Sequence, residues 1–528
     1  MKQMSRLSWK LLVTGLVLCT LTGTPAAAED CGLNDYDCAV QSVQRKDFNS
    51  AITTLHEILK GEPGNLKALN LLGIALTETG KPQEANACFQ RALQLDPQFS
   101  PALKNLAVNE FRSKQFDASM SHFEEFLQRA PNDEVAHVSL AEIYYKRGQC
   151  GAALTHFEKS RARVVNAPDL LLHYSDCALK AGEQQQALAL LDHLPQADPQ
   201  DQFQAGLMLA KAGMFAPAAQ HFELARPGYP DPYQAAFNAA LAYLKLGDGD
   251  SAVRVASAML DQGYRRPEVY SLLSQGYVKQ GKIKEAYDAL RTATELDPQE
   301  ENNYLDLGLL CLDYPNYDLG LEITNIGLSF LPNSYRLYLQ RGLMKAMKRQ
   351  LAEAASDFEQ SSRLAPDKTL PYVAQGIILI QSGRDQDALK LLRQRAKASP
   401  KDFLVHYVLG EALLWSGPEV GSAVEQEAFQ VFQTSIRLNP SFALAHARLG
   451  KILLRRGRVD EAMAQLEKAA ALDPSDPTPV YQLAAAYRKK GQTARAQELE
   501  KRVGEIHAQK TEDEIRATLR RIVKIEAP

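Results

Sequence analysis

The residues that could support chemistry lie scattered along a sequence of 528 residues. The ten histidines form no HExxH pair, and no Walker loop, strand-to-helix GxGxxG motif or nucleophile elbow occurs. The run Asp248-Gly249-Asp250-Ser251 resembles the start of a calcium loop, but the 12-residue length and the closing glutamate of such loops are missing. A turn between two helices explains it better. The sequence therefore predicts a protein that is not an enzyme and has no metal site and no cofactor.

Histidines recur at two positions of the repeat described below. His122, His156 and His221 share one position, which we expect on the outer face of a helix, so solvated surface residues explain them better than a row of metal ligands. His406 and His446 share a packing position, and we expect them in the core. Acidic residues are spread beside Lys and Arg, as is typical of solvated helix faces, and no carboxylate pair stands out as acid and base.

Cysteines could form disulfides if the chain is exported to an oxidising compartment. Cys31 and Cys38 lie close together, where a bond would resist fraying of the N-terminus, although two free thiols remain the alternative. Cys150 and Cys177 lie in consecutive repeats and could also meet. The remaining two fit as small core residues, and no CxxC pair indicates zinc. The six cysteines after residue 28 are Cys31, Cys38, Cys88, Cys150, Cys177 and Cys311.

Residues 1–28 have the pattern of a signal peptide. Basic residues come first, residues 11–24 are apolar or small, and Ala26 and Ala28 form a cleavage pattern before Glu29. An uncleaved anchor is the alternative, but the apolar stretch is short for a span of about 20 residues. We expect cleavage before Glu29, a periplasmic or secreted mature protein, and no integral membrane segment after cleavage.

Composition and charge exclude two further classes. The chain is 45% hydrophobic and 23% charged, which is ordinary for folded soluble proteins and argues against wholesale disorder. The net charge is −3, and no long basic run occurs, so nucleic acid is not an expected partner.

A period of 34 residues organises nearly all of the remaining sequence. Each period reads as two helices: in residues 267–300, apolar residues recur at spacings of three and four, Gly281 interrupts them, a second stripe follows, and Pro298 ends it. Small residues at the eighth and twentieth positions let the two helices approach closely, and an aromatic or leucine at position 24 fills the space between them. The period is seen in Gly308, Gly342, Gly376 and Gly410, and in Tyr270, Tyr304, Tyr338 and Tyr372.

This pattern resembles the tetratricopeptide repeat family, in small residues at positions 8, 20 and 27 and proline at 32 over residues 32–510. The resemblance implies an all-α, right-handed α-solenoid of about 14 stacked helix-turn-helix repeats. The family's tryptophan at position four is replaced by Tyr, Leu or His. The repeats start near 32, 66, 100, 134, 168, 199, 233, 267, 301, 335, 369, 403, 443 and 477.

Three segments depart from the regular array. The sixth repeat starts about three residues early, and the twelfth carries six extra residues near 415–421, where Gly and Pro predict a loop. Residues 511–528 are expected to form a capping helix, with Thr511 and Glu514 as a capping box. Its apolar face carries Ile515, Leu519 and Ile522, so a helix that docks on a partner is the alternative.

The family's geometry implies that positions 5, 9 and 12 of each repeat face a concave groove. Many of these positions are apolar here, and an exposed apolar face commonly marks a binding surface. If the repeat register is wrong by one residue, or if the superhelix is tight, these positions would instead lie in the core. The predicted groove residues are Phe203, Leu207, Phe237, Leu241, Leu305, Leu309, Leu339, Leu343, Val373, Ile377, Tyr407, Leu414 and Trp415.

The sequence therefore predicts an exported, non-catalytic scaffold that captures a segment of a partner protein in an apolar groove. Two alternatives remain: a self-associating component of an envelope, secretion or polysaccharide-export assembly, and a regulatory subunit of a separate enzyme. The family's carboxylate clamp needs Lys and Asn at positions 5 and 9 of one repeat. Lys104 meets the first demand but Val108 fails the second, so capture of a chaperone C-terminus is not expected.

Overall fold

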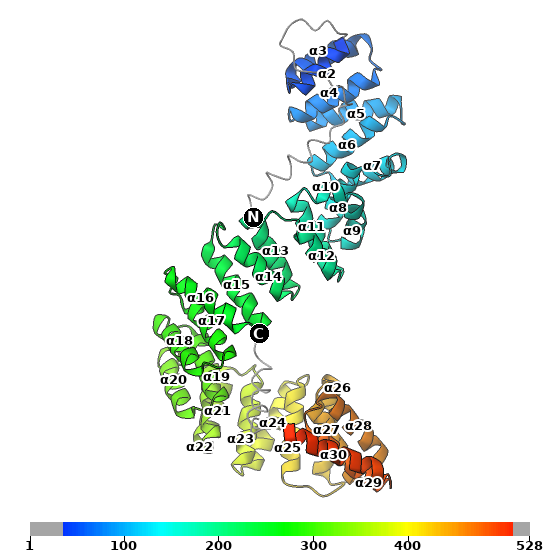
Figure 1. Cartoon of the computed structure of the whole chain (residues 1–528). Coiled ribbons are helices and arrows are strands. Elements are labelled where there is room, and N and C mark those ends of the chain that lie inside the picture. Colours follow the sequence, from blue (N-terminus) through cyan, green and yellow to red (C-terminus); the bar gives the residue numbers. More distant parts are fainter. Residues whose placement is uncertain (1–34, 510–528) are drawn as a thin grey trace. The chain divides into compact units, whose positions relative to one another are not determined.

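The computed structural model describes residues 35–509, which form 29 α-helices and no strand (Figure 1). This confirms the all-α solenoid. The predicted signal peptide, Cys31 and residues 511–528 lie outside the described residues. The chain divides into two compact units, called here the N-terminal part, residues 1–255, and the C-terminal part, residues 256–528.

Successive helices pack as hairpins along each part. The N-terminal part contains α2 (Asp35–Gln44), α3 (Phe48–Gly61), α4 (Leu66–Glu78), α5 (Pro82–Leu95), α6 (Ser100–Arg112), α7 (Phe116–Arg129), α8 (Glu134–Lys146), α9 (Cys150–Lys159), α10 (Arg161–Val164), α11 (Pro168–Lys180), α12 (Gln184–Leu191), α13 (Pro199–Lys211), α14 (Phe215–Ala225) and α15 (Pro232–Leu246). Helix α16 (Gly249–Asp261) spans the boundary.

The C-terminal part continues the alternation of first and second helices. It contains α17 (Pro267–Lys279), α18 (Ile283–Leu296), α19 (Glu301–Asp313), α20 (Tyr317–Phe330), α21 (Tyr335–Met347), α22 (Leu351–Leu364), α23 (Leu370–Gln381), α24 (Asp385–Ala398), α25 (Phe403–Trp415), α26 (Ala423–Leu438), α27 (Ala443–Arg455), α28 (Val459–Leu472), α29 (Pro477–Lys489) and α30 (Thr493–Gln509).

In several hairpins the two helices touch at a glycine at position 8. A Cβ atom added at Gly342 would lie 2.6 Å from the Phe358 ring, and one at Gly410 would lie 2.5 Å from the Phe432 ring. Both phenylalanines are almost fully buried. The predicted pairing of a small residue at position 8 with a large one at position 24 is therefore a direct steric contact.

In most repeats the turn between paired helices has a left-handed residue at position 15. Glycine supplies it at most repeats, as at Gly281 (φ 74°) and Gly383 (φ 70°). Lys114 and Arg349 adopt the same conformation at φ 60° and 62°. Glycine reaches this region without steric cost, so these two residues fold against their own preference.

Three polar side chains at position 4 donate to the proline carbonyl of the preceding turn: His137 Nε2 to Pro131 O at 2.9 Å, His446 Nε2 to Pro440 O at 3.1 Å, and the Tyr304 hydroxyl to Pro298 O at 3.2 Å. His446 is buried, as expected, and His406 is half-buried. Each bond satisfies a carbonyl that follows a helix end and would otherwise lack a partner.

The three histidines at position 23 are half-buried rather than fully solvated, so the expectation of surface residues is met only in part. Each is half-buried and bonds through Nδ1 to the first helix of its own repeat. His122 lies 2.7 Å from Glu110 Oε2, His156 lies 2.9 Å from His137 Nδ1, and His221 lies 2.6 Å from Gln202 Oε1. They therefore serve hairpin packing separately, and the described residues contain no cluster of three or more metal-ligating side chains.

A disulfide joins Cys150 of α9 to Cys177 of α11, across two consecutive repeats, with a Cα–Cα distance of 4.9 Å. Cys38 is also disulfide-bonded, but its predicted partner Cys31 lies outside the described residues. Cys88 and Cys311 are free, and Cys311 packs in the core as expected. Of the two disulfides considered from the sequence, the one whose cysteines lie farther apart along the chain, Cys150–Cys177, is therefore present.

The insertion in the twelfth repeat is an anchored loop between α25 and α26. The Gly421 amide donates to Glu425 Oε2 at 2.7 Å, and Nε of Arg456, the residue that follows α27, lies 3.1 Å from the same oxygen. Glu425 is fully buried. The carboxylate therefore ties the loop to the following repeat. Trp415, at the end of α25, is 61% exposed.

Substitution Gly342→Ala should destabilise the C-terminal part, because its new methyl group would overlap the Phe358 ring. We expect a loss of about 1–3 kcal/mol in the free energy of unfolding, measured by urea denaturation. Gly504→Ala in α30 is the matched control, since nothing lies within 4 Å of its Cβ position. Unchanged stability of Gly342→Ala would disprove the close contact.

Stability should fall as the pH drops below about 6.5, in part because of His156. The pKa of His156 is lowered to about 4, mainly because the ring is buried and also because His137 lies beside it. A histidine in the unfolded chain titrates near 6.5. Between these values the unfolded chain binds more protons, so acid favours unfolding, and the effect levels off below the folded pKa. His156→Gln should flatten this dependence in urea melts, whereas exposed His56→Gln should not.

Candidate interaction surface

One face of the first helices is the candidate site. At 100° per residue, positions 5, 6, 9, 12 and 13 of a repeat span about 120° of a helix, so they share one face. We call this face, on α17, α19, α21, α23, α25, α27 and α29, the first-helix surface. The equivalent face of the N-terminal part lies on α4, α6, α8, α11, α13 and α15.

Three of the predicted groove residues at position 5 pack in the core rather than facing solvent. Phe203, Leu339 and Val373 are only 2%, 8% and 0% exposed. The next first helix covers this position: the Gln340 side chain of α21 donates to Leu305 O of α19 at 2.7 Å. The three buried side chains belong to the interhelix core, so their assignment to an open groove does not hold.

Position 9 and the helix ends remain open. Leu207 is 39% exposed, Leu309 is 37% exposed and Trp415 is 61% exposed. The other predicted residues are half-buried, and several pack partly against core clusters behind the surface. The half-buried set is Phe237, Leu241, Leu305, Leu343, Ile377, Tyr407 and Leu414.

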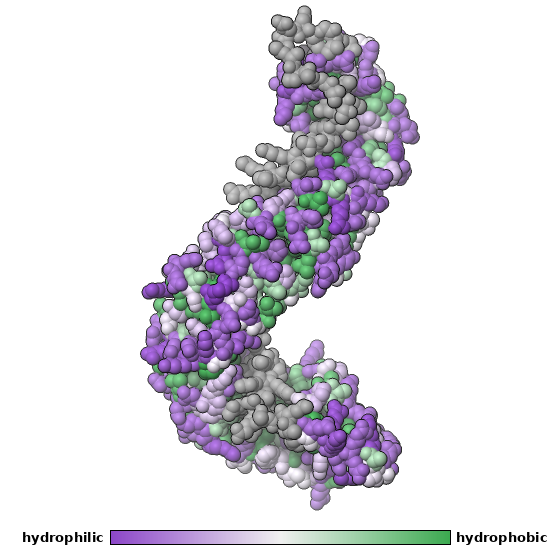
Figure 2. Space-filling model, viewed as in Figure 1, coloured by the Kyte–Doolittle hydropathy of each residue, from purple (hydrophilic) through white to green (hydrophobic). Residues whose placement is uncertain are grey.

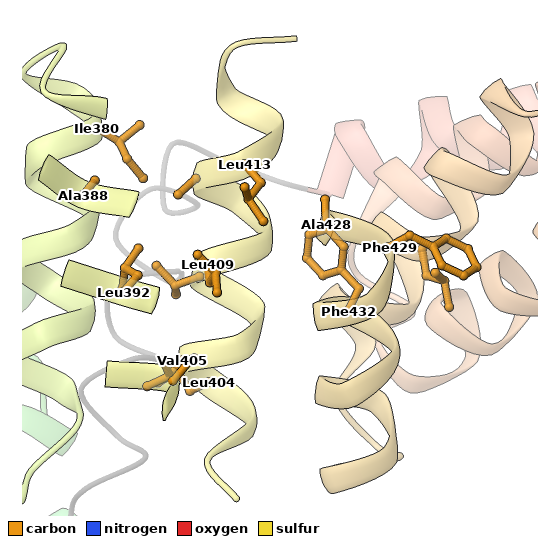
Figure 3. Packing of buried hydrophobic residues seen from close by; sticks show 14 of the residues in the cluster. Ile380, Ala388, Leu392, Leu404, Val405, Leu409, Leu413, Ala428, Phe429 and Phe432 are labelled. Atoms are coloured by element: carbon orange, nitrogen blue, oxygen red, sulfur yellow. The ribbon is translucent and has the colours of Figure 1, made fainter. Parts of the chain in front are cut away.

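The core behind α25 fixes the backbone of this face. Leu409 and Leu413 of α25, Leu392 of α24 and Phe432 of α26 belong to one buried cluster, and Figure 3 shows them between their helices. Ile377 and Leu414 pack against the same cluster. These half-buried side chains are thus held on one side and open on the other.

In the N-terminal part, polar side chains on α4, α6, α8 and α11 satisfy one another across the equivalent face. Asn105 donates to Asn70 at 2.9 Å, Arg112 pairs with Glu78 at 2.7 Å, and His173 lies 2.6 Å from Glu142. Each contact joins neighbouring first helices. Lys104, the clamp residue considered above, is buried and pairs with Asp133 at 2.6 Å, so it is not available to a ligand.

Charged residues that the sequence reading passed over also lie on the first-helix surface. Burial raises the pKa of Asp306 and neighbouring Glu300 adds to this, although Arg336 opposes them. Arg448 holds Glu411 with two bonds of 2.6 and 2.8 Å. Asp306 and Arg448 occupy position 6 of their repeats, which the sequence analysis of positions 5, 9 and 12 did not include.

Hydrophobic residues on the face drawn in Figure 2 form separate patches among hydrophilic ones. The described helices include none that is long and apolar enough to cross a membrane. The features that distinguish the first-helix surface are therefore local: open leucine and tryptophan side chains on a rigid backbone.

Four segments match models of one repeat family. Residues 42–109, 138–202 and 267–300 match models described as tetratricopeptide repeat, and residues 450–491 match a model described as TPR repeat. The matches fall in both parts of the chain. Repeats of this family bind protein partners.

Curated relatives are distant. The chain is 21% identical over 319 residues to DnaJ homolog subfamily C member 3 of Gallus gallus, covering 55% of this chain and 63% of that protein. It is 21% identical over 231 residues to BBSome complex member BBS4 of Bos taurus, covering 40% and 44%. The chain thus spans less than two thirds of the length of either curated relative.

Among solved structures, yeast Tom70 matches with a TM-score of 0.41 at 16% identity, covering 87% of this chain and 96% of that one. The family assignment follows from the matched repeats and the helical hairpins. The chain belongs to the tetratricopeptide repeat family.

Proposed function

We propose that this protein is an exported, non-catalytic scaffold that captures a segment of a partner protein on the first-helix surface of its C-terminal part. The observation that carries the proposal is the exposure of Leu309, in the middle of a helix whose opposite side packs in the core. An apolar side chain held open on a rigid helix is typical of a docking position.

The energetics suit a specific contact. Burying one such side chain contributes about 1.5–3 kcal/mol before ordering costs. Two anchors of about 2 kcal/mol each would strengthen binding by roughly a thousandfold. Leu309 and Trp415 are the most open of the predicted residues in this part, so they are the expected anchors.

Export is supported by the cysteine chemistry. The disulfide between Cys150 and Cys177 joins two repeats, and such bonds persist in oxidising compartments. Together with the signal pattern of residues 1–28, this favours a periplasmic or secreted protein.

Leu309→Asp should weaken partner capture by about tenfold or more and leave the helical content unchanged, because the side chain is open. The readout is pull-down from the native envelope fraction, with circular dichroism for folding. Leu207→Asp, at position 9 of the N-terminal part, is the matched control. Equal capture by both variants would rule out the C-terminal part as the binding face, and light scattering would separate capture from self-association.

Export predicts a mature protein that begins at Glu29 and contains oxidised Cys150 and Cys177. N-terminal sequencing and mass spectrometry before and after reduction check both points. The bond closes a separation of 27 residues, so its loss should lower stability by about 3–4 kcal/mol on the chain-entropy model. A retained leader in a reducing compartment would contradict the proposal.

A further inference from the structure

Two open aromatic side chains mark the C-terminal end of the first-helix surface, on α25, α27 and α29. Trp415, the last residue of α25, and Tyr481, at position 5 of α29, are each 61% exposed. At the same position 5, Leu339 and Val373 are only 8% and 0% exposed. A large aromatic side chain that stays open on a folded surface suits the role of an anchor, because it can bury much apolar area when a partner binds.

The backbone that follows Trp415 is held in place. Arg455 Nη2 donates to Pro418 O of the insertion at 2.7 Å, and the Gly421 amide donates to fully buried Glu425, also at 2.7 Å. These bonds join the insertion to α26 and to the next first helix. A surface that is already ordered loses less conformational freedom when it binds a partner.

The same end of the surface is rich in cations. Helix α27 carries them at positions 6, 9 and 13, and α29 carries them at positions 12 and 13. The corresponding position 9 of α25 supplies one carboxylate, Glu411, and the insertion adds exposed Glu419. The cations are Arg448, Lys451, Arg455, Arg488 and Lys489.

The three arginines have carboxylate partners. Arg448 holds Glu411 with bonds of 2.6 and 2.8 Å, and Arg488 pairs with Glu500 of α30. Arg455 Nη1 lies 3.9 Å from Glu425 Oε1, a longer contact with a carboxylate that Arg456 also holds. The arginines are therefore largely neutralised by the protein itself.

The two lysines are not neutralised. Within residues 35–509, neither Lys451 nor Lys489 pairs with a carboxylate, and both side chains are exposed. The Lys489 ammonium group donates to Leu454 O at 3.1 Å, a bond that leaves its charge in place. Even with Glu419 included, this end of the surface thus has more positive than negative charge to offer a partner.

The open aromatics and Lys451 lie on one line across three first helices. The bond from Arg448 to Glu411 joins α27 to α25, and the bond from Lys489 joins α29 to α27, so these helices are neighbours. Trp415, Lys451 and Tyr481 occupy positions 13, 9 and 5, each step being four residues, or about 6 Å along a helix axis. With axes about 10 Å apart, roughly seven extended residues would cross all three side chains.

We propose that this end of the first-helix surface binds an acidic segment of a partner protein. Carboxylates of the segment pair with Lys451 and Lys489, and its apolar side chains cover Trp415 and Tyr481. The inference deepens the proposed function and rests on it. A protein segment fits better than an anionic bilayer, which is typically recognised by clusters of about four to eight basic residues.

Fluorescence of Trp415 tests the proposal, because the chain contains only one other tryptophan, Trp9. The full chain with Trp9→Phe is mixed with three synthetic peptides of about twelve residues. They share leucine and phenylalanine and carry either glutamate, glutamine or lysine at the other positions. We expect the glutamate peptide to shift the Trp415 emission and to bind about tenfold more tightly than the glutamine peptide, and the lysine peptide to bind most weakly.

Lys451→Glu should remove the preference for the glutamate peptide, because it replaces attraction by repulsion. Exposed Lys468→Glu, on α28 of the same repeat, is the matched control and should keep the preference. Circular dichroism verifies the fold of both variants. Salt at 1 M should also remove the preference, because the Debye length then falls to about 3 Å.

Equal binding of the glutamate and glutamine peptides would overturn the proposal, and so would an unchanged emission with all three. Phosphatidylglycerol vesicles form a separate arm. An emission shift with these vesicles but not with the glutamate peptide would overturn the proposal in favour of a bilayer.

Failure of this inference can be told apart from failure of the proposed function. Partner capture that depends on Leu309, together with no charge preference at Trp415, would overturn only the acidic segment. Capture unaffected by Leu309→Asp, together with a glutamate preference that Lys451→Glu removes, would support the acidic segment and contradict only the anchor at Leu309.

Discussion

In the hairpins with glycine at position 8, the paired helices approach too closely to leave room for a side chain there. A methyl group at Gly73, Gly206 or Gly342 would overlap a buried phenylalanine ring of the second helix. Because the first helix meets its partner this tightly, the faces that remain must be covered by neighbouring hairpins. Stacking then fixes which first-helix positions are buried and which remain open, so the binding face follows from the glycine contact.

The first-helix surface differs between the two parts for a physical reason. In the N-terminal part, polar pairs such as Glu142 with His173 join successive first helices and satisfy one another. In the C-terminal part, positions 9 and 12 of the ninth to twelfth repeats are mostly leucine or isoleucine, and the charged residues of this face lie in the repeats on either side of them and at Asp306, Asp313 and Glu411. One repeat architecture thus carries a self-satisfied face and a face suited to a partner.

The 34-residue period predicted the helices and the glycine contacts well, since both recur and are local. Side-chain environment was harder to predict. Val373 was placed in a groove but is core, because it packs in one cluster with Leu404 and Val405 of the next repeat, a contact that a single repeat does not reveal. Phe203 is also core, stacked on Tyr229. Likewise His156 turns inward to His137, a pairing across 19 residues that helical spacing alone did not indicate.

The central claim is that partners bind the first-helix surface of the C-terminal part. A structure of the mature protein with its captured partner would test this most directly. The account predicts partner side chains in contact with Leu309 and Trp415, on the open faces of α19 and α25. A partner that contacts only the second helices, or only the N-terminal part, would contradict it.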